Sequence, residues 1–405
     1  MPALRFKDKN GQAFEAPDEL TIQDLFDKVK ATNKDGANKN VITNSAEHGL
    51  IPQREFFDKD IAVEGNTSKY TIIKDGDFVY NPRKSSTAPY GPFNCYTREE
   101  PGIVSPLYSC LTPKNKAYTP YLLYYFASPA WYSYIYHNGN QGGARHDRVG
   151  MTDDLLQGIP VLLPCQEEQD KITAFLSLYD KRIVAQASKV EALEARRKGL
   201  LQQIFSQEIR FKADDGSEFP DWKDTRLGDI FYRVNERNDG TFDKTKWISV
   251  AKMYYQDPEK VTSNNIYTRT YVMRFGDIAF EGHPNSEFLY GRFVVNDIGD
   301  GVISELFPIY RHKEKEYVNN YWKYAIQIEN IMAPIYQKAI LISGNSSNKL
   351  NEDDFLRQSI PVPCIAEQHK IASMFILVDK QIQLEKDKLE AIKQVKKGLL
   401  QQISV

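Results

Sequence analysis

The chain has 405 residues, enough for two or three domains, and its 41% hydrophobic and 26% charged residues are ordinary for a globular protein. The formal net charge of −2 gives no general attraction to nucleic acid, so a surface that binds phosphates would have to be a local basic cleft. No apolar signal region or membrane-length apolar run is present, and the four cysteines form no C-x-x-C pair, which together predict a reduced, cytoplasmic protein.

Residues 1–164 predict a globular domain that mixes strands and helices. Strand-rich, turn-punctuated sequence at 70–80 is followed by an aromatic stretch of helical pattern at 120–136. A polar, glycine-rich loop at 137–148 comes next, before a short strand that delivers the chain to a long helix.

That long helix is predicted at 165–206, because apolar residues recur at alternating spacings of four and three, which is the a/d seam of a coiled coil. The pattern recurs at 364–405. A single apolar seam needs a partner, and the economical partner is the other copy. The predicted seam residues are Ile172, Leu176, Tyr179, Ile183, Val190, Leu193, Leu200 and Ile204 in the first helix, and Ile371, Phe375, Val378, Ile382, Leu389, Ile392, Leu399 and Ile403 in the second. Polar residues interrupt the two seams at matching points, Gln186 and Arg197 in the first and Glu385 and Lys396 in the second.

The two halves of the chain repeat a common frame. Glu-Gln-x-Lys-Ile opens both helices, at Glu168 and Glu367, and Lys-Gly-Leu-Leu-Gln-Gln-Ile closes both. Leu-Arg-Phe at 4–6 corresponds to Ile-Arg-Phe at 209–211, so residues 207–363 predict a second globular domain. Joining the C-terminus to the N-terminus would recreate the junction at mid-chain. We therefore expect approximate two-fold symmetry and antiparallel pairing of the helices.

Polar loops at corresponding points of both halves provide the candidate binding residues. Arginine suits bidentate contact with guanine and with phosphate, asparagine can read adenine, and glutamate can accept from cytosine. The alternative interpretation is that these loops are solvated turns, selected for Gly, Asn and Pro geometry. Their recurrence in both halves favours function. The candidates are Tyr80, Arg83, Lys84, Arg145, His146 and Arg148 in the first half, and Glu281, His283, Asn285, Ser346, Asn348 and Lys349 in the second.

Catalytic and metal-binding interpretations find little support. The acidic pairs at 153–154 and 353–354 each precede a short strand, where turn or capping residues are expected. His146 and His283 have no companions at ligand spacing, so we predict no metal site. The chain contains no P-loop, no G-x-G-x-x-G after a strand and no serine-centred elbow, and it is predicted to be non-catalytic.

Two variable globular segments, each followed by an E-Q-x-K-I…K-G-L-L-Q-Q-I helix, resemble the specificity subunit of Type I restriction-modification systems. The likeness covers nearly the whole chain, and the segments at 76–80 and 276–280 look like the Gly-Asp strand of that family. The second half departs from the first at 281–283, where Glu-Gly-His replaces Asn-Pro-Arg.

The resemblance implies an α+β fold, in which two globular α/β target recognition domains are separated by two long antiparallel coiled-coil helices related by a pseudo-two-fold repeat. Each domain would read one half of a bipartite, asymmetric double-stranded DNA target, and the helices would set the gap between the halves. Two methyltransferase subunits and restriction/translocase subunits are the implied partners. S-adenosylmethionine, ATP and Mg are expected in those partners and no cofactor in this chain. The rival hypotheses are a coiled-coil scaffold that binds only proteins and an enzyme with an unrecognised site.

Overall fold

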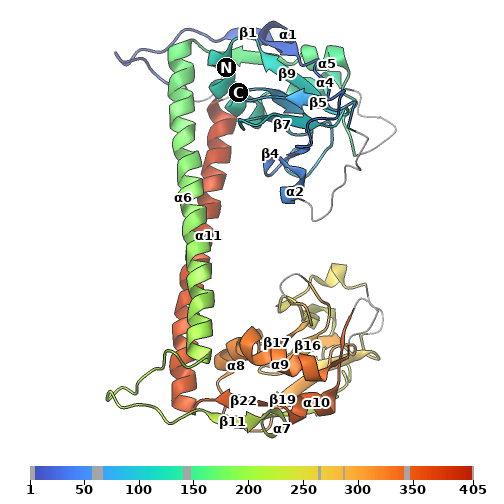
Figure 1. The fold of residues 1–405 in the computed structure, drawn as a ribbon, viewed down its shortest axis with the longest axis vertical. Helices are drawn as coiled ribbons and strands as arrows, with labels where there is room; N and C mark the ends of the chain where they lie inside the picture. Colours follow the sequence, from blue (N-terminus) through green and yellow to red (C-terminus); the bar gives the residue numbers. More distant parts are fainter. Residues whose placement is uncertain are drawn as a thin grey trace. The chain divides into compact units, whose positions relative to one another are not determined.

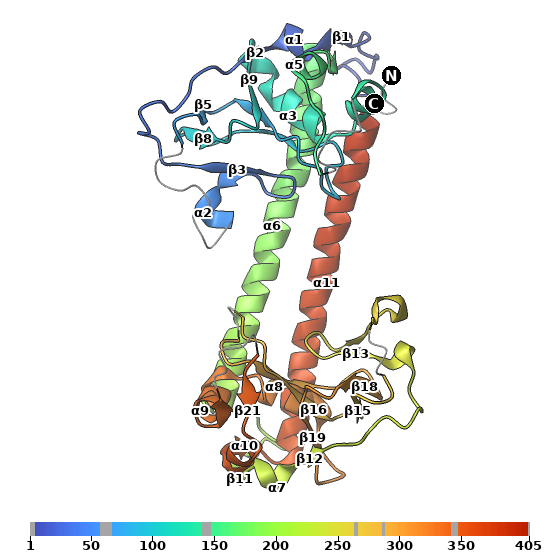
Figure 2. The ribbon, with the colours of Figure 1, turned by 90° about the vertical axis from the view of Figure 1, so that its right-hand side faces the viewer.

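The computed structural model describes residues 5–56, 67–139, 147–262, 266–285, 288–341 and 347–403. It contains both helices and strands, as the sequence predicts (Figures 1 and 2). The chain divides into two compact units. Unit 1 comprises Met1–Ala187 and Asp387–Val405, and unit 2 comprises Ser188–Lys386. Each unit therefore contains one of the predicted globular domains together with part of both long helices.

The elements of unit 1 other than the long helices are short. Its strands are β1 (Asp18–Thr21), β2 (Phe26–Lys28), β3 (Ile42–Ser45), β4 (Gly49–Pro52), β5 (Thr71–Ile73), β6 (Phe78–Tyr80), β7 (Phe93–Cys95), β8 (Gly102–Val104), β9 (Ser109–Pro113) and β10 (Pro160–Leu163). Its helices are α1 (Ile22–Leu25), α2 (Gln53–Phe56), η1 (Lys116–Tyr118), α3 (Thr119–Ala127), α4 (Tyr132–Asn138) and α5 (Asp153–Gln157).

Unit 2 has a similar succession of elements. Its strands are β11 (Lys223–Arg226), β12 (Phe231–Val234), β13 (Ile248–Ser249), β14 (Tyr254–Tyr255), β15 (Thr270–Met273), β16 (Ile278–Glu281), β17 (Arg292–Val295), β18 (Gly301–Ser304), β19 (Ile309–His312), β20 (Ile340–Leu341), β21 (Lys349–Leu350) and β22 (Ser359–Val362). Its helices are α7 (Leu227–Ile230), η2 (Lys244–Lys246), η3 (Pro258–Lys260), α8 (Asn319–Ala325), α9 (Glu329–Ala339) and α10 (Glu352–Arg357).

The central sheet of each unit has four antiparallel strands in the same order, β2-β9-β6-β7 in unit 1 and β12-β19-β16-β17 in unit 2. Two further strand pairs correspond as well, because β1–β10 and β5–β8 in unit 1 match β11–β22 and β15–β18 in unit 2. The two units thus share a topology although the sequence between their common motifs has diverged.

Aromatic side chains build the cores on these sheets. The Phe93 ring lies 4.2 Å from that of Phe126 in unit 1, and the Phe293 ring lies 4.6 Å from that of Phe355 in unit 2. The aromatic stretch at 120–136, for which the sequence predicts a helical pattern, forms two helices, α3 and α4, and its counterpart at 319–338 in unit 2 likewise forms α8 and α9. In unit 1 the break falls at Ser128 to Trp131, where Pro129 cannot continue a helix and the Ser128 hydroxyl caps the Tyr125 carbonyl.

The two long helices are α6 (Gln166–Phe205) and α11 (Ile365–Ile403). In unit 1, Lys396 near the end of α11 pairs with Asp180 in the first half of α6. In unit 2, Arg197 near the end of α6 pairs with Asp379 in the first half of α11. Because an early residue of one helix meets a late residue of the other in both units, the helices run antiparallel.

Every residue of the two predicted seams, polar interruptions included, is buried or half-buried. Three of the four polar interruptions have a partner of opposite charge on the facing helix: Arg197 and Lys396 in the pairs above, and Glu385, which lies 3.1 Å from Lys189. A tyrosine of each globular part also reaches the seam, because Tyr124 donates to Asp180 at 2.7 Å and Tyr324 donates to Asp379 at 2.8 Å. Burial raises the pKa of both tyrosines, and the hydrogen bond to the carboxylate acts in the same direction.

The first turn of each long helix is tied to the arginine of the Arg-Phe motif in the same unit. In unit 1 the Nε of Arg5 donates to Oε1 of Glu168 at 3.1 Å. In unit 2 the Nη2 of Arg210 donates to Oε2 of Glu367 at 2.8 Å, and Nε1 of Trp222 donates to the same oxygen at 3.0 Å. Both glutamates are almost fully buried. The two repeated motifs are therefore partners in space.

The glutamine and the lysine of each Glu-Gln-x-Lys motif donate hydrogen bonds to backbone carbonyl groups. Nζ of Lys171 donates to the carbonyl of Lys7 and Nζ of Lys370 to that of Lys212, both at 2.7 Å. The glutamine amides donate to the carbonyl groups of Pro164 and Pro363 just before the helices. Each repeated polar residue thus has the same structural role in both units.

None of the helices in the described ranges combines the length and the apolar character needed to span a bilayer.

We expect Arg210→Met to lower the free energy of unfolding of unit 2 by about 3 kcal/mol, because it leaves the buried Glu367 carboxylate without its countercharge. Urea denaturation of the full chain measures the loss. Asp221→Asn is the matched control, because Asp221 also lies 3.4 Å from Arg210 but its side chain is fully exposed. Equal urea midpoints for Arg210→Met and the wild type would contradict the assigned role of the buried pair.

Candidate nucleic-acid interface

In unit 1 the structure brings two predicted loops together. The segment after β6 pairs with the segment at 147–149, which includes the end of the polar loop. Arg83 and Arg148 form an isolated antiparallel β-bridge, and the N–H of Val149 donates to the carbonyl of Pro82 at 2.8 Å. The backbone therefore holds the two arginines as neighbours although 65 positions separate them in the sequence.

Unit 2 brings the corresponding loops together. The N–H of Asn348 donates to the carbonyl of Gly282 at 2.8 Å. A Cβ atom on Gly282 would lie 2.2 Å from the carbonyl oxygen of Asn348, so this close approach requires glycine. In unit 1 the loop after β6 thus lies against the segment that precedes α5. In unit 2 the loop after β16 lies against the segment that precedes α10.

Several of the predicted binding residues are accessible. The Arg83 side chain is 70% exposed, and its Nε lies 3.8 Å from Asp147, an exposed carboxylate. Lys349 is exposed, whereas Lys84, Arg148 and Asn348 are half-buried. Arg145, His146 and Ser346 lie outside the described residues.

Tyr80 does not fit the predicted role of a base-reading residue. It is fully buried, and its hydroxyl donates to the carbonyl of Tyr90 at 2.7 Å. Its ring packs against Phe93 and Trp131 in the core. The physical reason is that β6 is an inner strand, between β9 and β7, and that all of its side chains, on either face of the sheet, are buried. Tyr80 is therefore a core residue and leaves the set of proposed DNA contacts.

Glu281 is also buried, with only 5% of its surface exposed, and its predicted contact with cytosine is not compatible with this position. Its Oε1 accepts a hydrogen bond from the N–H of His283 at 3.0 Å and lies 2.5 Å from the ring Nδ1. The His283 side chain is 57% exposed. Glu281 therefore orients His283, and His283 is the residue of this segment that can reach a ligand.

Asn285 has a structural role in the same loop. Its Oδ1 accepts a hydrogen bond from the N–H of Phe288 at 2.9 Å, which closes a turn. The residue is exposed, so its amide nitrogen remains on the surface of unit 2.

The Gly-Asp motif before β6 and β16 is structural. Gly76 and Gly276 both have φ of 88°, a conformation that glycine adopts without strain. In unit 2 Asp277 accepts from the N–H of Arg274 at 2.7 Å and from Arg311 at 2.8 Å. Burial raises the pKa of Asp277, and the hydrogen bonds from Arg311 oppose this rise. The motif fixes the start of the strand that carries the loop.

The acidic pairs at 153–154 and 353–354 lie in the first turns of α5 and α10, where negative charge is favourable for a helix. The Thr152 side chain caps α5 and the Asn351 side chain caps α10. Within the part of the chain that the structure describes, no group of three or more His, Cys, Asp or Glu side chains is placed to hold a metal ion.

Sequence reasoning missed two residues near the arginines of unit 1. Gln53 at the start of α2 and Tyr108 in the loop between β8 and β9 line the same cavity as Arg83 and Arg148. Neither residue stands in a repeated motif or a basic cluster. Only the folding of distant segments onto one another brings them to the arginines.

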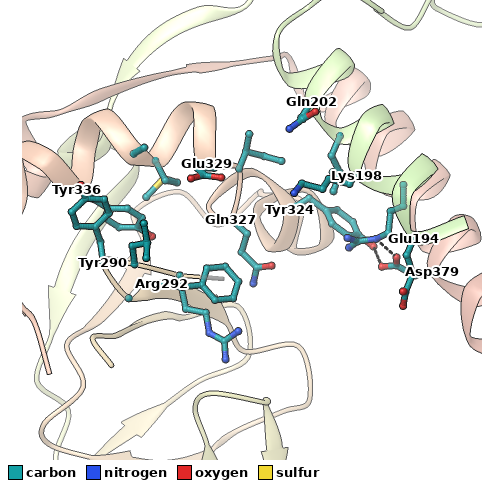
Figure 3. Close-up of a pocket in the computed structure, with 18 of the residues that line it drawn as sticks. Glu194, Lys198, Gln202, Tyr290, Arg292, Tyr324, Gln327, Glu329, Tyr336 and Asp379 are labelled. Atoms are coloured by element: carbon teal, nitrogen blue, oxygen red, sulfur yellow. Dashed lines mark hydrogen bonds and ion pairs between the residues drawn. The ribbon is translucent and has the colours of Figure 1, made fainter. Parts of the chain in front are cut away.

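Unit 2 contains a larger cavity, of about 680 Å³, between α6, α11, α9 and the turn that joins β16 to β17 (Figure 3). Lys198 and Gln202 reach it from α6, and Tyr336 lies on the opposite side (Figure 3). Its lining is partly apolar, with Met332 buried and Leu289 68% exposed. Such a lining suits contact with another polypeptide.

Two proteins with similar sequences are named as specificity subunits of type I restriction enzymes. The chain is 21% identical over 269 residues to the Type I restriction enzyme MjaVIII specificity subunit of Methanocaldococcus jannaschii, with 61% of each chain covered. It is 23% identical over 314 residues to the putative type I restriction enzyme MjaX specificity subunit of the same organism, covering 71% of this chain and 67% of that protein. The chain thus spans about three fifths of the length of the first relative. No protein-family model matches the chain.

The fold is shared with a solved chain from a study of complex assembly and conformational transition of the type I R-M system. The match has a TM-score of 0.57 and 13% sequence identity, and it covers 96% of this chain and 98% of that chain. Together with the two relatives, it confirms the resemblance that the repeated motifs indicated.

We expect Gly282→Ala to separate the paired loops of unit 2, because the new methyl group collides with the Asn348 carbonyl. Hydrogen exchange at the Asn348 amide should accelerate by at least about tenfold as its bond to Gly282 is lost. Gly199→Ala is the control, because a Cβ at Gly199 meets nothing within 4 Å. This control should leave Asn348 exchange unchanged and stabilise α6 by up to about 1 kcal/mol. Unchanged exchange in Gly282→Ala would contradict the close approach.

Proposed function

We propose that this chain is the non-catalytic DNA-specificity subunit of a type I restriction-modification complex, and that it acts in the cytoplasm. It would bind a bipartite double-stranded DNA target and position methyltransferase and restriction subunits, which would carry S-adenosylmethionine, ATP and Mg. The observation that carries the proposal is the pairing of corresponding polar loops in both units, Arg83 with Arg148 and Gly282 with Asn348. The names of the two relatives support it.

The two units would read different sequences. They share a strand order, yet the paired loops carry arginines in unit 1 and glycine, histidine and asparagine in unit 2. Since arginine and asparagine favour different bases, a common frame with different loops supports an asymmetric target. The proposed contacts among the described residues are Arg83, Lys84, Arg148, His283, Asn285, Asn348 and Lys349, and Arg145, His146 and Ser346 remain predictions from the sequence.

The internal repeat supports a pseudo-two-fold architecture of two recognition domains joined by a coiled coil. Residues 1–164 and 207–363 would form the recognition domains, and 165–206 and 364–405 the helices. The repeat also suggests that one kind of partner binds twice. The closing motif of each helix keeps exposed residues identical in both copies, Lys198, Gln202 and Gln203 in α6 and Lys397, Gln401 and Gln402 in α11.

Packing cannot account for the identity of residues that face solvent, so we infer that a methyltransferase subunit contacts each copy. In unit 2 the cavity beside Lys198 and Gln202 is the proposed contact region. A scaffold that binds only proteins would also use these residues, but it would not need polar loops that pair at corresponding points of both units.

Methylome sequencing tests the proposal directly. In cells that carry this chain with its methyltransferase partner, we expect methylation at a bipartite, non-palindromic motif that is absent from cells lacking only this chain. The reconstituted complex should bind duplexes with that motif, with an affinity that falls as salt rises. If methylation is the same with and without the chain, the proposed function is wrong and the protein-only scaffold is favoured.

The length of the helices should set the gap between the half-sites. The test variant has one heptad inserted after Ala187 in α6 and one after Lys386 in α11, which are the boundaries between the two units. Both insertions fall between the units, so the ion pairs of Lys396 with Asp180 and of Arg197 with Asp379 inside each unit are kept. The insertion lengthens the helices by roughly 10 Å, or about three base pairs of DNA. The motif should gain that spacing and keep its bases. Seven residues inserted instead at the exposed turn beside Gly216 should leave the gap unchanged, and a constant gap in both variants would contradict the prediction.

A further inference from the structure

A cavity of about 330 Å³ lies in unit 1 between the β3–β4 hairpin, the loop after β6 and the loop that joins β8 to β9. Gln53, Arg83, Tyr108 and Arg148 bring hydrogen-bonding groups to it from four separate segments of the chain. Arg83 and Arg148 were proposed above as contacts, and the cavity adds the two other residues.

Two asparagines whose side-chain nitrogen and oxygen are both hydrogen-bonded within unit 1 hold the cavity in shape. Nδ2 of Asn44 donates to the carbonyl of Val79 and its Oδ1 accepts from Asn94, both at 2.7 Å. Nδ2 of Asn81 donates to the carbonyl of Asn44 at 3.1 Å, and its Oδ1 accepts from the N–H of Arg83 at 3.0 Å. The floor of the cavity is therefore preformed, and the asparagines do not need a ligand.

The guanidinium groups of Arg83 and Arg148, in contrast to the two asparagines, have hydrogen-bond donors that are not used within unit 1. Nε of Arg148 is buried and has no hydrogen-bond partner among the described residues. Arg83 pairs with Asp147 at the long distance of 3.8 Å and remains exposed. Two neighbouring cations with unused donors favour a ligand that is rich in hydrogen-bond acceptors.

Gln53 and Tyr108 complete the lining. Tyr108 lines the same cavity as both arginines. Burial raises the pKa of its phenol, while a backbone hydrogen bond from Asn44 and the charges of Arg148 and Arg83 lower it. Gln53 is half-buried, and its amide offers both a donor and an acceptor. A phosphate presents only acceptors. The major-groove edge of a base pair presents donors as well as acceptors, and it can use the arginines, the amide and the phenol hydroxyl together.

We propose that this cavity receives the edge of a guanine in the half-site read by unit 1, with Arg83 and Arg148 donating to O6 and N7 and with Gln53 and Tyr108 as further specificity-determining residues. Guanine shows two acceptors in the major groove, and arginine is their usual partner. The inference rests on the proposed function, because it needs DNA at this surface.

The experiment uses the full chain assembled with its methyltransferase partner. Duplexes randomised across both half-sites are selected by binding to the wild-type complex and to Arg148→Gln, Gln53→Ala and Tyr108→Phe complexes, and then sequenced. For Arg148→Gln, the preference for guanine at one position of one half-site should fall by roughly 10- to 100-fold. Gln53→Ala and Tyr108→Phe should relax the same position or its neighbour, and the other half-site and the gap should not change. Lys116→Gln removes an exposed charge of unit 1 outside the cavity and should leave all positions unchanged.

The outcomes separate the two proposals. A wild-type complex without any bipartite preference would refute the proposed function itself. If the guanine preference is unchanged in Arg148→Gln, or if affinity falls equally on all sequences, the guanine cavity alone is overturned, and Arg148 is a bystander or a phosphate contact. If Arg148→Gln fails to assemble, Arg83→Gln provides the same test, because its exposed side chain tolerates substitution.

Discussion

The buried pairing of a glutamate in the first turn of each long helix with an arginine at the start of the same globular segment is the interaction on which the rest of the structure depends. Glu168 and Glu367 lie almost wholly out of water, so each needs the countercharge of Arg5 or Arg210. The pair joins two points of the chain that are about 160 residues apart. It therefore holds the start of each globular segment against the first turn of the long helix that follows that segment.

Charged residues also define how the helices pair. An apolar a/d seam alone permits several registers, because leucine and isoleucine pack equally well after a shift of one heptad. The pairs of Lys396 with Asp180 and of Arg197 with Asp379 allow only one, since any shift would leave half-buried charges without partners. Tyr124 and Tyr324 bond to the same aspartates, so the register of the helices is linked to the globular cores in each unit.

On this frame the proposed contact residues are exposed or half-buried, and they differ between the two units. The Gly-Asp turn and the central sheet place one loop after β6 or β16 against another loop from late in the same segment, and backbone hydrogen bonds hold the two together. Side chains in such loops can change without disturbing the core. A constant frame with different loops would let the two units read different half-sites, as our proposal requires.

The sequence by itself determined the features that rest on local periodicity and on repetition. Heptad spacing located both long helices and their seams, and the duplicated motifs indicated two similar units. Only the tertiary structure decided which polar residues are accessible. Tyr80 and Glu281 stand beside turn residues in the sequence, but they end inner strands of the two central sheets, β6 and β16, whose side chains are all buried. Gln53 and Tyr108 carry no sequence signal, and they meet Arg83 and Arg148 only because distant segments fold together. Burial and long-range proximity depend on which segments pack against each other, and a single sequence does not contain that information in any local pattern.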